Sequence, residues 1–158
     1  AISLGATSLN VDVSFDRFTG ITNYSSRSAA ALGKLSVKTV ANVSDSVFTA
    51  QFLILGGFPT GWKYLDCHIT SWLVSGVPFE LPQATHVGKV ANRGGVVDGI
   101  SQALSKEAFF ELADSGRIQY KVCNDEFEFT PTELSDLKAI ASRIKKDHPE
   151  LIEPGRGK

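Results

Sequence analysis

Hydrophobic and polar residues alternate along much of the first two thirds of this chain, which is the pattern of half-buried β-strands. The clearest case is the segment 9–15, where apolar residues occupy the odd positions and polar residues the even ones. The polar segment 19–28 predicts a loop, with a short strand as the alternative. Further strands are expected at 35–43, 47–55, 62–74, 86–90 and 95–104, with Asp98-Gly99 as a bulge or turn in the last of them.

The pattern changes after residue 104. Ser105 has the chemistry of a helix N-cap, Glu107 falls in the first turn, and Gly116 marks the expected end of that helix. The segments 117–122 and 126–129 alternate again and predict a hairpin. Asn124 and Asp125 are its expected two-residue turn, because both residue types tolerate the left-handed backbone conformation.

A second helix is expected from Pro131 to about Lys146. Thr130 can cap it, and Glu133 stands three residues later, which together make a capping box. Apolar residues then recur at helical spacing and predict a stripe packed on the sheet: Leu134, Leu137, Ala141 and Ile144.

Strands followed by helices indicate an α+β fold. We expect a mostly antiparallel β-sandwich or curled sheet of about seven or eight strands, with two C-terminal helices packed on one face or edge. The length of 158 residues favours one domain, placed at residues 1–150, with a flexible C-terminal tail at 151–158.

Charge and hydropathy narrow the range of partners. The formal net charge is −1, with 16 basic and 17 acidic residues, so the chain lacks the basic character of a nucleic-acid-binding domain. No apolar run reaches the roughly 18 residues of a membrane span. The oligomeric state is left open.

The chain has two cysteines, Cys67 and Cys123, and no methionine even at position 1. A disulfide between them would suit an oxidising compartment, and a missing start would suit cleavage of a leader. We therefore expect a Cys67–Cys123 bond and a secreted or periplasmic protein. The alternative is a cytoplasmic protein with two buried thiols.

The segment 62–74 gives the candidate site. Taken as one strand, its odd positions form an expected core set: Leu65, Cys67, Ile69 and Leu73. Its even positions mix aromatic and polar side chains and form the predicted ligand-binding face: Trp62, Tyr64, Asp66, His68 and Trp72. The alternative is that the helices cover this second face and bury its aromatic rings.

No catalytic motif is present, and the leading hypothesis is an exported, non-enzymatic, β-rich module that binds a small molecule, a glycan or a protein through the mixed face. It assigns no catalytic residue, metal ligand or cofactor. One alternative is a small metal-dependent hydrolase that uses Asp66, His68 and His86. Another is a structural subunit that associates with copies of itself through sheet edges or helices.

Overall fold

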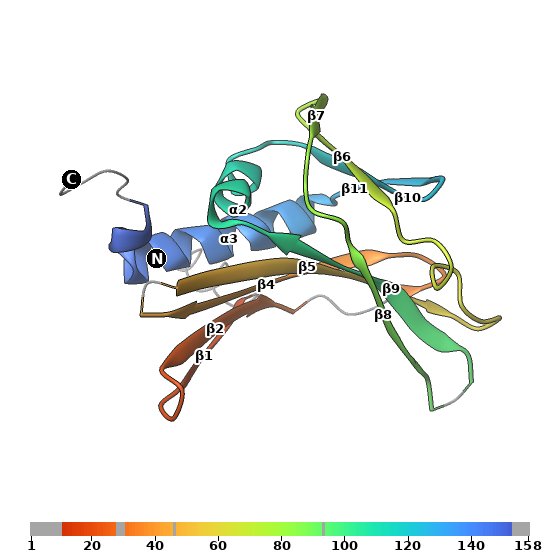
Figure 1. Cartoon of the computed structure of the whole chain (residues 1–158), viewed down its shortest axis with the longest axis horizontal. Coiled ribbons are helices and arrows are strands. Elements are labelled where there is room, and N and C mark those ends of the chain that lie inside the picture. Colours follow the sequence, from red (N-terminus) through yellow and green to blue (C-terminus); the bar gives the residue numbers. More distant parts are fainter. Residues whose placement is uncertain (1–10, 28–30, 46, 93, 153–158) are drawn as a thin grey trace.

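The computed structural model describes residues 11–27, 31–45, 47–92 and 94–152, and it shows the expected α+β architecture with mostly antiparallel strands (Figure 1). The larger sheet has seven strands in the order β1-β2-β4-β5-β9-β8, with β3 paired to β5. Its strands are β1 (Val11–Asp16), β2 (Ile21–Ser26), β3 (Ala31–Leu32), β4 (Ser36–Ser44), β5 (Val47–Phe58), β8 (Thr85–Val90) and β9 (Val96–Leu104).

The smaller sheet has four strands in the order β11-β10-β6-β7. They are β6 (Thr70–Val74), β7 (Val77–Phe79), β10 (Ile118–Val122) and β11 (Asp125–Glu128). Every neighbouring pair in both sheets is antiparallel except β3 beside β5. The smaller sheet and the helices lie over the same side of the larger sheet (Figure 1).

The helices are α2 (Lys106–Ala113), α3 (Pro131–Asp147) and the short 3-10 helix η1 (Pro149–Leu151). The predicted capping box of α3 is confirmed, since Thr130 Oγ1 accepts from the Glu133 amide and the Glu133 carboxylate accepts from the Thr130 amide. The predicted apolar stripe is also confirmed, and Leu137 is fully buried in the core between α3 and the sheets.

Several predicted boundaries need correction. The segment 19–28 carries β2, so the alternative of a short strand was right. Helix α2 is capped by Ser105 as expected, but it ends at Ala113 with Asp114 as C-cap rather than at Gly116. The hairpin turn lies at Cys123 and Asn124, one residue earlier than predicted, because Cys123 takes the left-handed conformation with φ of 57°.

The expected bulge or turn at Asp98-Gly99 is wrong, because β9 pairs with β5 and with β8 in unbroken register through both residues. Gly99 is needed for packing instead. A Cβ atom at this position would collide with the backbone carbonyl of Ile54 on β5. The pattern of glycine after aspartate therefore marks a close approach of two strands.

Residues 1–10 of the predicted domain, which include the first two residues of the segment 9–15, lie outside the described residues, and so do the tail residues 153–158. Leu151, at the start of the predicted tail, is buried in the core. In the described part of the chain, no helix combines the length and the apolar composition that crossing a bilayer requires.

Candidate functional site

The predicted strand at 62–74 is wrong over its first two thirds. Residues 59–69 form a loop, and only Thr70–Val74 is a strand. The start of this loop is held by the carboxylate of Asp98, whose Oδ2 accepts from the amides of Lys63 (2.5 Å) and Tyr64 (2.8 Å). Asp98, some 35 residues later in the sequence, thus accepts hydrogen bonds from two amides that would donate to a neighbouring strand if this segment were part of a sheet.

The predicted binding residues are therefore divided. Tyr64 and Trp72 are buried, with Trp72 only 4% exposed. Trp62 remains 41% exposed and lies across Gly88 of β8, where a Cβ atom would meet its ring at 2.7 Å. His68 is half-buried, and Asp66 is exposed in the loop.

The expected core set on the odd positions is also wrong. Ile69 is 64% exposed, Leu73 is 36% exposed, and Leu65 is exposed as well. The alternation holds in β6, and the alternative of buried aromatic rings is right for Tyr64 and Trp72, whereas the expected core positions face outward. The smaller sheet turns its aromatic side toward the larger sheet, because those rings bury the most apolar area.

We call this buried side of the smaller sheet the inner face. Trp72 stacks on Tyr120 with ring centroids 5.2 Å apart, and Tyr120 stacks in turn on Phe127 at the same distance. Trp72 also contacts Phe52 of the larger sheet, and its Nε1 donates to Oε1 of the buried Gln102 (3.2 Å). Burial raises the pKa of the Tyr120 hydroxyl above its usual value of 10.0. The inner face is therefore part of the hydrophobic core, with Phe127 partly buried at its margin.

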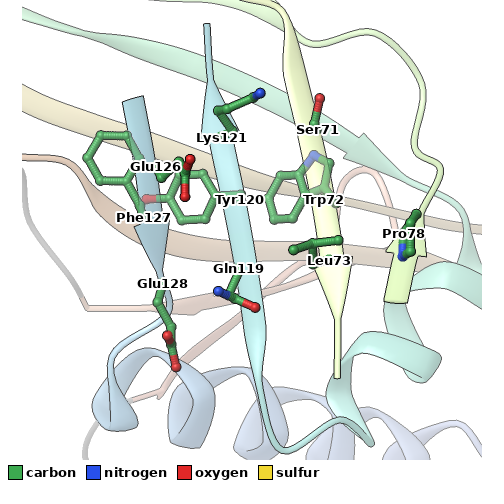
Figure 2. A pocket seen from close by; sticks show the side chains of 10 residues that line it. All are labelled: Ser71, Trp72, Leu73, Pro78, Gln119, Tyr120, Lys121, Glu126, Phe127 and Glu128. Carbon is green, nitrogen blue, oxygen red and sulfur yellow. The ribbon is translucent and has the colours of Figure 1, made fainter. Parts of the chain in front are cut away.

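The opposite side, the outer face, is hollowed. A hollow of about 540 Å³ lies over β6, β7, β10 and β11 (Figure 2). Seven side chains of the outer face line it, and the lining also includes the three residues between them whose rings lie on the inner face: Trp72, Tyr120 and Phe127. The outer-face residues are Ser71, Leu73, Pro78, Gln119, Lys121, Glu126 and Glu128.

These side chains form two rows across the sheet. Register places Lys121 opposite both Ser71 and Glu126, and places Gln119 opposite both Leu73 and Glu128, as the two rows in Figure 2 show. Each row therefore combines hydrogen-bond donors with carboxylate acceptors.

The charges of the hollow nearly cancel. Arg117 pairs with Glu128 at 3.3 Å, and both side chains are about half exposed. Lys121 faces Glu126 across the β10–β11 pair. The balance of charge and the apolar surface of Leu73 suit a polar but nearly neutral ligand. The sequence alone could not reveal this surface, because nothing in it shows that β6 lies two strands away from β11.

The predicted disulfide is confirmed. The Cys67 and Cys123 Cα atoms lie 6.1 Å apart and the sulfur atoms are bonded. The bond joins the loop 59–69 to the turn between β10 and β11, and the Cys123 amide also donates to the Ile69 carbonyl (2.8 Å). The loop and one end of the smaller sheet are thus fixed to each other.

A second group of polar side chains surrounds Asp98. His86 Nε2 lies 2.6 Å from Asp98 Oδ1, and Asp98 is fully buried. The His68 ring is 6.3 Å from the His86 ring, and its Nδ1 has no hydrogen-bond partner among the described residues. The structure thus brings the two predicted histidines together, but the acid beside them is Asp98 rather than Asp66.

Asp98 was missed as a functional residue, although its single charge within the apolar segment 96–104 was a usable signal. Within the described ranges, no group of three or more His, Cys, Asp or Glu side chains is arranged to hold a metal ion.

Comparison of the chain with known proteins finds no matching family model, no matching curated protein and no matching solved structure.

Proposed function

We propose that this protein is an exported binding domain whose outer face holds an extended segment of a protein partner. The observation that carries the proposal is the hollow of about 540 Å³, a volume within the usual range of ligand sites. It keeps the binding role expected for β6 but moves it to the opposite side of that strand.

The chemistry of the hollow favours a peptide chain. The two rows of the outer face present both hydrogen-bond donors and acceptors. The donors are on Ser71, Gln119 and Lys121, and the acceptors are on Glu126. A main chain presents amides and carbonyls that match such rows. The rings of Trp72, Tyr120 and Phe127 stack with one another on the inner face, so they offer no free platform for a sugar.

The disulfide supports the exported location. Such bonds form and persist in oxidising compartments and are rare where glutathione keeps thiols reduced. The near-zero net charge argues against a partner held by long-range electrostatic attraction. Recognition would instead depend on short-range hydrogen bonds and on the apolar contact of Leu73 and Pro78.

The proposal is tested by mapping small probes on the protein by amide chemical-shift perturbation. We expect capped tripeptides at millimolar concentration to shift the amides of β6, β10 and β11, and methyl glycosides to leave them unchanged. Glycosides that shift these amides, with peptides inert, would replace the peptide by a glycan. Shifts confined to other elements would contradict the proposed site.

A second candidate function is acid–base chemistry at His86. Asp98 holds its Nε2, which leaves Nδ1 as the nitrogen that could take a proton from a water molecule. The test is hydrolysis of p-nitrophenyl acetate above the buffer rate. His86→Ala should abolish that excess and His148→Ala, at the end of α3, should keep it; equal rates in both variants would remove this candidate.

A further inference from the structure

In the described part of the chain, five strands have a neighbouring strand on one side only, and four of them carry features that oppose pairing with another chain. Strand β3 is only two residues long. Strand β7 is three residues long and contains Pro78. Strand β11 holds three acidic residues within four positions. Strand β8 carries Lys89 at an exposed position. Proline, short length and charge are the usual means by which edges avoid association.

Strand β1 is different. It pairs only with β2, so one side of its backbone has no strand beside it in the described part of the chain. All its odd positions are apolar, with Val11, Val13 and Phe15 on one side of the sheet. Val11 packs against the core, whereas Val13 is 36% and Phe15 64% exposed.

We propose that β1 pairs antiparallel with β1 of a second copy of this chain, which joins two seven-stranded sheets into one. The proposal is independent of the hollow, which belongs to the smaller sheet. The net charge of −1 leaves little repulsion between two copies.

The sequence of β1 selects one register. Facing residues lie on the same side of a sheet, so the apolar positions must face apolar positions. Centring the pair on Ser14 would oppose Asp12 to Asp16 twice. Centring it on Asp12 would oppose that carboxylate to its own copy.

Centring the pair on Val13 avoids both clashes of charge. Val13 then faces Val13 of the second copy, Val11 faces Phe15, and Asp12 faces Ser14. Asp12 keeps its ion pair with Arg27 of its own chain (2.7 Å). Because Val13 also lies opposite the buried Tyr24, the new apolar row continues the existing core. One edge strand of six residues is a small contact, so we expect a dimer that forms as concentration rises.

The test uses single cysteines, because both native cysteines are already bonded to each other. In Val13→Cys, the new thiols of two copies would be directly opposed, with Cβ atoms about 4.5–5.5 Å apart. We expect mild oxidation to convert this variant into a disulfide-linked dimer, because only directly opposed thiols approach bonding distance. Ser14→Cys, the matched control on the neighbouring position, should cross-link at least tenfold more slowly.

A second substitution tests whether cross-linking depends on the apolar contacts of Val11 and Phe15 between the two copies. Adding Phe15→Glu to Val13→Cys should abolish the covalent dimer, and circular dichroism should show that the fold is kept, since Phe15 is largely exposed. Monomeric Val13→Cys, or equal cross-linking of Val13→Cys and Ser14→Cys, would overturn the proposal.

Discussion

The two faces of the four-stranded sheet are built by the same strands and differ in almost every physical property. On the inner face, Trp72, Tyr120 and the partly buried Phe127 stack on one another, and Trp72 packs against Phe52 of the larger sheet. The outer face carries serine, glutamine, lysine and glutamate side chains around a hollow. Adjacent residues therefore differ in their contacts: Trp72 packs against Phe52 of the larger sheet, and Leu73 lines the hollow.

Under the proposed function, this difference separates the residues that stabilise the fold from those that bind the partner by a single step along the chain. Substitutions on the inner face should change the free energy of unfolding. Substitutions on the outer face should change binding and leave that free energy nearly constant. The following predictions test the separation, beginning with the largest expected effect.

Trp72→Ala should lower the free energy of unfolding by about 3–5 kcal/mol, the range for truncating a buried tryptophan. The indole contacts Phe52 and Tyr120, and its loss leaves a cavity and frees Gln102 Oε1 from one donor. Urea denaturation followed by circular dichroism measures the change. Trp72→Phe keeps most of the apolar contact and should cost less; equal stability of Trp72→Ala and the wild type would mean that this side is not core.

Replacing both Cys67 and Cys123 by serine should lower the free energy of unfolding by about 2–4 kcal/mol. The bond closes a long loop between the segment 59–69 and the β10–β11 turn, so its loss enlarges the freedom of the unfolded chain. Denaturation of the double variant, compared with the oxidised wild type, provides the measurement. An unchanged denaturation midpoint would show that hydrogen bonds alone fix this end of the sheet.

Alkaline pH should lower the free energy of unfolding of the whole domain, and Tyr120 of the inner face should contribute to that fall. Burial raises the pKa of Tyr120 above 10.0, and burial with an adjacent carboxylate raises the pKa of Tyr24 and of Tyr64. Above pH 10 the unfolded tyrosines lose protons that the folded ones keep, so the free energy of unfolding falls as pH rises.

The expected slope is about 1.4 kcal/mol per pH unit for each tyrosine that stays protonated in the folded state. Denaturation at several pH values between 9 and 11.5 measures it, and Tyr120→Phe should make the slope shallower. A slope that Tyr120→Phe leaves unchanged would mean that this hydroxyl ionises as freely in the folded protein as in the unfolded chain.

The sequence predicted those features that depend on neighbouring residues. Thr130 and Glu133 cap α3 through each other, and Leu137 follows at helical spacing, so local chemistry determines that element. The Cys67–Cys123 bond was also accessible, because the chain offers only one possible pair.

The segment 62–74 could not be placed in the same way. The loop 59–69 is held by the carboxylate of Asp98, which lies on β9 of the larger sheet, about 35 residues later in the sequence. The phase of β6 depends on which side meets the larger sheet, and alternation alone gives two equivalent answers. The hollow needs β6, β7, β10 and β11 side by side, an arrangement set by long-range pairing.

The most direct test of the central claim is a comparison of stability and peptide binding in Leu73→Glu, with Val47→Glu on β5 as the control at another exposed apolar site. We predict that Leu73→Glu changes the free energy of unfolding by about 1 kcal/mol or less and removes the tripeptide-induced shifts on β6, β10 and β11. Val47→Glu should keep those shifts. Full tripeptide binding by Leu73→Glu, with the shifts on the same strands, would contradict the assignment of the outer face as the binding surface.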